Sequence, residues 1–328
     1  MSGQRSLPGR ADTVFLALAV GFVALRLFDV RPWDQSVDAY AYWRPIQGGS
    51  PYGGAAVGDL GSYLYSPAFK LLCVPLGLLP WPVFNAAWTA LNLAVYRSVA
   101  GRWALPLLLF LPIPFEIISG NVHILYAGAI VAAISRGPGW AASWCLLLLT
   151  KVTPGIGLIW HLVRREWRSL AIAVFATIAV AAGSAVIVPG WWAEWYRILV
   201  GSTSGPPATP GWYLPVPLLV RLPAAAVLVA WGGVTSRRWT VPVAVVLALP
   251  VLWLNGLAVL AALVAPGFAP EVPLDPRRVE RARQATRRGD AHLSVDPLDR
   301  QRRSRSLALR WAPSAGSRRV RSRRHSTS

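Results

Sequence analysis

Asp38 and Lys151 are the two side chains of this sequence best suited to chemistry. Asp38 has the type and position for proton transfer, and Lys151 has the type and position to stabilise a negative charge. Asp38 stands in D-A-Y-A-Y-W, soon after the first apolar block, where a carboxylate can take a proton from an attacking hydroxyl group. Lys151 stands in K-V-T-P, at the centre of an apolar block, where a cation is costly to insert into a membrane. Such a lysine needs an anionic partner, and we expect Glu116, Asp38 or a ligand phosphate.

The residues around Asp38 form the first candidate binding segment. Asp34 lies four residues before Asp38, so on a helix both carboxylates share a face with Tyr42. The stretch Q-S-V-D-A-Y-A-Y-W therefore predicts a short helix along the outer membrane interface. Tight turns at G-G-S-P-Y and Y-L-Y-S-P are expected to fold the loop back over the membrane, which adds Tyr52 and Tyr65 to the candidate substrate-binding residues.

A second polar group surrounds G-N at the junction of two later apolar blocks, and it consists of Glu116, Asn121 and His123. A polar side chain at such a junction either makes a structural hydrogen bond or contacts a ligand, so all three are candidate substrate-binding residues. His123 and His161 have no acidic or Cys partners at metal-ligand spacing, and we expect no metal site. The sequence contains no Walker motif, no G-x-G-x-x-G fingerprint and no G-x-S-x-G elbow.

The composition is that of a protein that crosses the membrane several times. Hydrophobic residues make up 54% of the chain and charged residues 14%, whereas a soluble domain has about 25% charged residues. Apolar blocks of roughly 17–25 residues are long enough to cross a bilayer as helices. We predict an all-α polytopic membrane protein with about eight or nine spans, at residues 13–29, 64–80, 82–97, 103–119, 122–136, 139–163, 168–189, 214–234 and 240–264.

Basic residues predict the orientation of these spans. Arg5 and Arg10 precede the first block and place the N-terminus in the cytoplasm. Residues 30–63 and 190–213 are then expected outside, in a multi-pass protein of the cell membrane. The block 139–163 contains Lys151 and Pro154 at its centre, and proline removes a backbone donor. Either a kinked span or a pair of half-helices fits this block.

The C-terminal segment differs from the rest. We divide the chain into a membrane domain, residues 1–265, and a tail, residues 266–328, in which 16 Arg stand against six Asp and Glu. The tail has no apolar periodicity, so we predict disorder. Its origin stays open between an anionic-lipid-binding tail, a nucleic-acid arm and sequence translated out of frame after a truncated membrane domain. The two cysteines, Cys73 and Cys145, are expected to be unpaired thiols.

Taken in order, the Asp–Tyr segment, G-x-P-Y, Y-S-P, G-N and K-x-T-P followed by R-R-E-W-R resemble glycosyltransferase family 87. The resemblance implies a GT-C-like helical bundle and a mannosyltransferase-like hexosyltransferase. It implies a sugar donor on a polyprenyl phosphate, a glycolipid or polysaccharide acceptor at the outer face, and inversion at the anomeric carbon. It assigns the catalytic base to Asp38, the K-x-x-P lysine to Lys151 and the family's Asn to Asn121, with no cofactor.

Three functional hypotheses remain. The first is the membrane glycosyltransferase, whose partners would be the lipid-linked donor, the acceptor and membrane lipids, with no nucleic acid. The second is a transporter or lipid flippase, because broken helices with an intramembrane lysine also mark substrate pathways. The third is a truncated, inactive member of the family that serves as a membrane scaffold.

Overall fold

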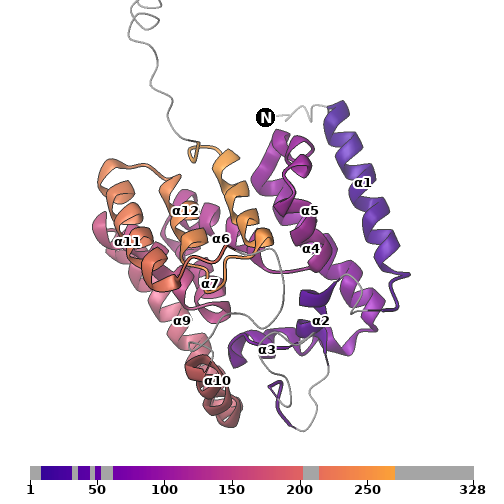
Figure 1. Cartoon of the computed structure of the whole chain (residues 1–328), viewed down its shortest axis with the longest axis horizontal. Helices are drawn as coiled ribbons and strands as arrows, with labels where there is room; N and C mark the ends of the chain where they lie inside the picture. Colours follow the sequence, from indigo (N-terminus) through magenta and orange to yellow (C-terminus); the bar gives the residue numbers. More distant parts are fainter. Residues whose placement is uncertain (1–8, 32–35, 45–48, 53–61, 202–213, 270–328) are drawn as a thin grey trace, which may run out of the picture. The chain divides into compact units, whose positions relative to one another are not determined.

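The computed structural model describes residues 9–31, 36–44, 49–52, 62–201 and 214–269, and these residues form helices and connecting turns without a β-strand. Asp34 and nearly all of the predicted tail lie outside the described residues. Figure 1 shows the arrangement of the helices. In chain order the elements are α1 (Arg10–Arg26), α2 (Val37–Trp43), α3 (Pro67–Cys73), η1 (Leu76–Leu78), α4 (Trp81–Ala100), η2 (Gly101–Trp103), η3 (Pro106–Leu109), α5 (Pro112–Ser119), α6 (His123–Ser135), η4 (Pro138–Ser143), α7 (Trp144–Thr150), η5 (Thr153–Leu158), α8 (Ile159–Val163), α9 (Trp167–Ile187), α10 (Pro189–Gly201), α11 (Leu218–Thr235), α12 (Thr240–Leu247) and η7 (Leu254–Val264).

Two or three helical segments of the described residues are long and apolar enough to cross a bilayer. Helices α9 and α11 meet this condition alone, and α5 with α6 meets it as a pair bent by 109°. The predicted count of eight or nine spans is therefore not confirmed. The predicted blocks 64–80, 103–119, 139–163 and 240–264 are each divided into shorter helices, because proline and glycine interrupt the hydrogen-bond ladder within them.

The block 139–163 breaks where the sequence predicts. Helix α7 ends at Thr150, Lys151 has an extended backbone with φ −141° and ψ 117°, and η5 begins at Thr153 with Pro154 in its first turn. In a continuous helix residue 154 would donate its backbone N–H to the carbonyl of Thr150, but proline has no N–H and its ring clashes with that carbonyl. Proline is also well placed at the start of a new helix. The break leaves Lys151 between two helical pieces rather than inside a continuous helix.

Helices α1 and α4 pack side by side and run in opposite directions (Figure 1). Near the start of α1, Asp12 Oδ1 accepts a hydrogen bond from Arg97 Nη2, at the end of α4, over 2.7 Å. Past the end of α1, Asp29 accepts from Asn85, near the start of α4. These contacts place the start of α1 and the end of α4 on the same side of the protein.

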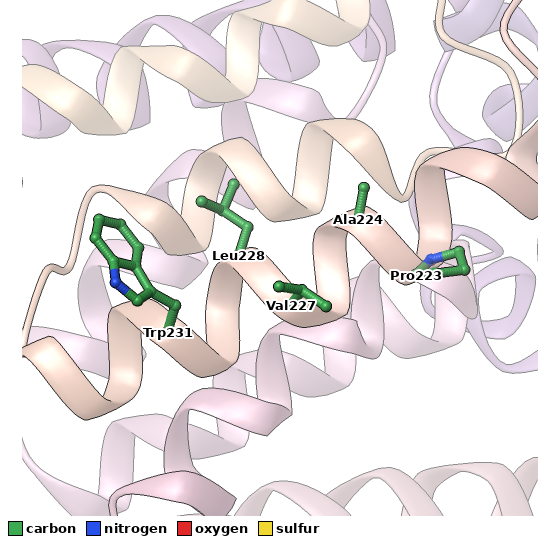
Figure 2. A pocket seen from close by; sticks show the side chains of 5 residues that line it. All are labelled: Pro223, Ala224, Val227, Leu228 and Trp231. Carbon is green, nitrogen blue, oxygen red and sulfur yellow. The ribbon is translucent and has the colours of Figure 1, made fainter.

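Helices α11 and α12 form a second packed pair. The buried Arg221 guanidinium donates to the carbonyls of Leu247 and Leu249, at and just after the end of α12, over 2.7 and 2.8 Å. Helix α11 also contributes apolar side chains to an open groove of about 470 Å³ (Figure 2). Its lining residues are Pro223, Ala224, Val227, Leu228 and Trp231. None of them is a candidate site residue, so this groove is separate from the polar cluster described next.

Candidate functional site

The short helix α2 carries Asp38 and Tyr42, which confirms the predicted helix in this segment. Its C-terminal end is held by Lys70 of α3, whose Nζ donates to the carbonyls of Tyr42 and Arg44 over 2.8 Å each. A cation at this position also interacts favourably with the helix dipole. Lys70, which the sequence analysis did not single out, therefore fixes the helix on which the candidate base stands.

The Y-S-P motif positions α3 against α7. Ser66 caps α3 by accepting from the backbone amide of Phe69, and Pro67 follows at the first helical position. The same serine hydroxyl donates to the carbonyl of Leu149, near the end of α7. Because Lys151 comes two residues after Leu149, this contact brings the loop that carries Tyr65 close to the break at Lys151.

Gly120 allows α2 to approach the α5–α6 break. Its backbone is left-handed, with φ 71° and ψ 30°, which glycine adopts at little cost. A Cβ at this position would lie 2.7 Å from Cβ of Ala39, the neighbour of Asp38. The carbonyl of Gly120 accepts from Nε1 of Trp88 over 2.6 Å. The G-N pair thus combines a tight turn with a close contact to α2, and it places Asn121 beside Asp38.

Asn121 links α2 to the tyrosine of the Y-S-P motif. Its Oδ1 accepts from the hydroxyl of Tyr65 over 3.3 Å and from the backbone amide of Val122 over 2.7 Å. The hydroxyl of Tyr42 donates to that of Tyr65 over 3.0 Å. The Asn121 side chain also lies near enough to lower the pKa of Asp38. Because its oxygen already accepts, its NH₂ group is the one that can donate to the Asp38 carboxylate.

Asp38 is partly buried on α2, outside the candidate spans. Burial, and then the nearby Glu116 carboxylate, raise the pKa of Asp38 above its ordinary value. Lys151, His123 and the hydrogen bond from Asn121 act in the opposite direction. A carboxyl group whose pKa is raised towards neutral pH is a stronger proton acceptor than an exposed aspartate, which suits a general base.

Lys151 is linked to Glu116 through His123. Lys151 Nζ lies 2.8 Å from His123 Nε2, and His123 Nδ1 lies 3.0 Å from Glu116 Oε2. Glu116 Oε1 accepts from the backbone amide of His123 over 2.5 Å. Among the partners expected for Lys151, Glu116 and Asp38 are near enough to interact electrostatically, but the atom in contact belongs to His123.

The structure brings seven of the sequence-predicted residues into one cluster, which we call the α2 cluster: Asp38, Tyr42, Tyr65, Glu116, Asn121, His123 and Lys151. Tyr52 contacts the cluster through a backbone atom, because its hydroxyl donates to the carbonyl of Tyr65 over 2.7 Å. The catalytic and binding roles of these residues stay predictions. Within the described residues, no three His, Cys, Asp or Glu side chains are placed to hold a metal ion.

Sequence reasoning missed one residue beside the network, Asn255 of η7, whose Nδ2 donates to Ser119 Oγ over 3.4 Å and whose side chain lies near the Glu116 carboxylate. Asn255 is an uncharged polar residue inside the apolar block 240–264. The rule that polar side chains at membrane depth are functional candidates would have selected it.

The family model of glycosyltransferase family 87 matches residues 63–269. The chain belongs to this family. It is therefore a membrane glycosyltransferase by family, as the resemblance of its motifs predicted. The matched segment includes Tyr65, Glu116, Asn121, His123 and Lys151, and it begins after α2. No curated protein and no solved structure matches the chain.

Proposed function

We propose that this family 87 protein transfers a hexose, in a mannosyltransferase-like reaction, from a polyprenyl-phosphate donor to a glycolipid or polysaccharide acceptor. The observation that carries the proposal is the α2 cluster. There a carboxylate suited to accept a proton, Asp38, and a partly buried ammonium group, Lys151, come within electrostatic reach of each other from distant parts of the sequence. A base for the acceptor hydroxyl and a cation for the leaving phosphate are the two groups that the proposed transfer uses.

The proposed step is a single displacement. The acceptor oxygen attacks the anomeric carbon while Asp38 takes the hydroxyl proton. The bond between that carbon and the phosphate oxygen breaks, and its electron pair stays on the phosphate. Lys151 stabilises the negative charge that develops there. Attack from the side opposite the leaving group inverts the anomeric configuration.

The aromatic residues of the cluster suit a sugar that must be held against the membrane. Tyr42, Tyr65 and Phe69 pack edge to face, with ring centroids 5.3–5.6 Å apart, and aromatic rings offer an apolar face together with a polar end. We propose Asp34, Tyr52, Tyr65 and Asn121 as the substrate-binding residues. Tyr42 is 0% exposed and its hydroxyl lies within hydrogen-bond distance of Tyr65 and Asn121, so we propose that it holds those two side chains in place. Because Lys151 supplies the cation, the proposed step uses no metal or other cofactor.

Transfer from a labelled lipid donor tests the proposal. Purified protein in lipid vesicles is given radiolabelled polyprenyl-phosphate mannose and a glycolipid extract, with a nucleotide-linked mannose as the control donor. We expect label in the acceptor from the lipid-linked donor alone, with the anomeric configuration inverted. Transfer from the nucleotide sugar alone would contradict the proposed donor. Movement of the lipid across the vesicle membrane without a new glycosidic bond would instead support the transporter hypothesis.

The proposed location of the site at the outer face of the cell membrane has its own test. In a background with Cys73 and Cys145 replaced by serine, single cysteines are introduced at Ser50, in the first loop, and at Ser98, an exposed residue at the end of α4. We expect a membrane-impermeant maleimide to label Ser50→Cys in whole cells and Ser98→Cys only after lysis. The reverse pattern would place the α2 cluster in the cytoplasm.

A further inference from the structure

Two rows of hydrogen-bonded side chains in this protein share one pattern. In each, a glutamate contacts one ring nitrogen of a histidine, and a donor group contacts the other ring nitrogen. We call them the first and the second hydrogen-bond chain. In the first chain Glu116 contacts His123 Nδ1, and Lys151 contacts Nε2. In the second chain Glu166 Oε2 lies 2.7 Å from His161 Nδ1, and Trp144 Nε1 donates to His161 Nε2 over 3.1 Å. The second chain reveals the tautomer that this pattern selects, because an indole nitrogen can only donate.

The same tautomer explains the first chain. A carboxylate beside Nδ1 favours a proton on that nitrogen, which leaves a lone pair on Nε2. His123 Nε2 then accepts from the Lys151 ammonium group, and every contact from Lys151 to Glu116 pairs a donor with an acceptor. A protonated His123 would set two donors against each other over the 2.8 Å contact with Lys151.

We propose that Glu116 and His123 are positioning residues that hold the Lys151 ammonium group towards the donor phosphate, rather than groups that touch the sugar. This inference rests on the proposed function, in which Lys151 meets that phosphate. It changes the role of two residues that the sequence analysis placed among the substrate-binding candidates.

Burial and hydrogen-bonding capacity carry the argument. Glu116 is 0% exposed and His123 1% exposed, whereas Lys151 is partly exposed. The Glu116 carboxylate interacts with the His123 ring and backbone, the Ile124 backbone amide and the Asn255 side chain. Both ring nitrogens of His123 are also occupied, so neither residue has a free group for a substrate.

Lys151, in contrast, keeps bonding capacity. An ammonium group has three donors, and His123 takes one of them. The Nζ atom also lies 5.8 Å from the centre of the Tyr65 ring, within the range of a cation–π contact. The remaining donors are available to an anion on the side of the cluster where Asp38, Tyr65 and Asn121 meet.

The sequence makes Lys151 unusually easy to observe, because Lys70 and Lys151 are the only lysines in the chain. Lys70 is 3% exposed. Acylation of each lysine by acetic anhydride, measured by mass spectrometry across a pH series, therefore reports on Lys151 directly. Reaction at Lys70 reports whether a variant has lost its fold.

Glu116→Gln is the most informative variant for this measurement. Its amide can present NH₂ to Nδ1 of His123 and so favour the other tautomer, which directs a hydrogen at Lys151. The variant also removes the negative charge that favours the ammonium form. Because only the unprotonated amine reacts, we expect Lys151 to acylate faster at a given pH while Lys70 stays protected. The matched control, Glu166→Gln in the second chain, should leave Lys151 at its parental rate.

Kinetics supply the second measurement. We expect Glu116→Gln and His123→Leu to raise KM for the lipid-linked donor and to lower kcat/KM by about 10- to 100-fold, as loss of an outer-shell partner does. His123→Gln keeps an acceptor for Lys151 and should recover part of the loss. KM for the acceptor should stay within about twofold of the parent, because a positioning role concerns only the donor.

The results separate two kinds of failure. Parental Lys151 acylation in both Glu116→Gln and His123→Leu, with Lys70 protected, would overturn the positioning role whether or not the protein transfers sugar. Altered acylation without any transfer would uphold the link to Lys151 and contradict only the proposed function. If Glu116→Gln exposes Lys70, His123→Leu carries the test, because it removes the acceptor for Lys151, and unchanged Lys151 acylation in that variant overturns the inference.

Discussion

The two hydrogen-bond chains differ in the group at their end. The first is Glu116–His123–Lys151, and the second is Glu166–His161–Trp144. The first ends on an ammonium group among Asp38, Tyr65 and Asn121, and its carboxylate is fully buried. The second ends on a buried indole, and its carboxylate is 34% exposed and paired with Arg164 over 2.7 Å. A buried histidine–glutamate pair therefore does not by itself identify a functional site. The group that it orients, and the residues around that group, determine what the pair can do.

Helix α7 connects the two chains. Trp144 is its first residue, and Lys151 follows its last. The Trp144 ring packs so closely on Gly157 that a Cβ at that glycine would lie 2.2 Å from a ring atom. The second chain therefore fixes the start of the helix whose far end presents Lys151. One hydrogen-bond chain holds the start of this helix in place, and the other contacts Lys151, the group proposed to meet the donor phosphate.

Loss of Asp38 should give the largest effect, because Asp38 stands beside the first chain and would perform the proton transfer. We expect Asp38→Asn to lower turnover by about 10²- to 10⁴-fold, since an amide cannot accept the proton. The raised pKa of Asp38 means that the fold favours its protonated form, so ionisation costs stability at pH values above that pKa. The neutral amide removes this cost, and the thermal midpoint at neutral pH should not fall.

The pH profile of the parent checks the same assignment. Turnover should decrease as the pH falls through the pKa of Asp38, which lies above the ordinary value of about 3.9. Asp38→Glu should retain part of the activity. Turnover of Asp38→Asn near the parental level would transfer the role of base to Asp34 or to another residue.

Loss of Lys151, the terminal group of the first hydrogen-bond chain, should give the next largest effect. We expect Lys151→Ala to lower kcat/KM for the lipid-linked donor by about 100-fold, and Lys151→Arg to recover only part of it, because a guanidinium fork does not replace a point charge. His161→Gln keeps an acceptor for Trp144 and should leave this value nearly unchanged. Equal losses in Lys151→Ala and His161→Gln would show that both chains are structural.

A purely structural Lys151–Glu116 pair predicts a different outcome for Lys151→Ala, namely misfolding that Glu116→Gln relieves. In the structure the Glu116 carboxylate contacts the backbone amide and the ring of His123, and neither contact involves Lys151. We therefore expect Lys151→Ala to fold, as shown by its thermal midpoint. Recovery of stability in the Lys151→Ala, Glu116→Gln double variant would favour the structural pair.

Substitution of each of the two glutamates by glutamine should have a smaller effect, which is a change in the free energy of unfolding. Glu116→Gln disturbs a buried network and should cost about 1–3 kcal/mol of the free energy of unfolding. Glu166→Gln disturbs a partly exposed ion pair and should cost less than about 1 kcal/mol. Reversible denaturation in detergent measures both. A cost for Glu166→Gln equal to or above that for Glu116→Gln would contradict this ranking.

Deletion of the Arg-rich tail should have the smallest effect, because neither hydrogen-bond chain includes a residue after Asn255. Removal of residues 270–328 is expected to leave membrane insertion and transferase activity unchanged, as judged by membrane fractionation and by transfer from the lipid-linked donor. Loss of insertion would show that the tail belongs to the membrane domain.

Much of the candidate site could be predicted from single residues. Glu116 and Lys151 are conspicuous because charges are rare in apolar sequence, and this rarity needs no knowledge of the fold. Asp38 lies in a loop with other charged residues, and it was selected by the motifs that follow it. The break at Lys151 also follows from local chemistry, since Pro154 prevents a regular helix there. The number of spans did not follow, because hydropathy measures how apolar a block is and does not reveal whether its helix stays continuous.

The sequence by itself determined the membrane class, the family and the set of polar residues that had to be explained, because these depend on composition and on residue order. Only the tertiary structure decided which of those residues meet. His123 became the partner of Lys151 because Gly120 bends α5 against α6, and Ser66 joins the Tyr65 loop to α7. Such contacts join residues far apart in the chain, and their geometry depends on packing that no local pattern encodes.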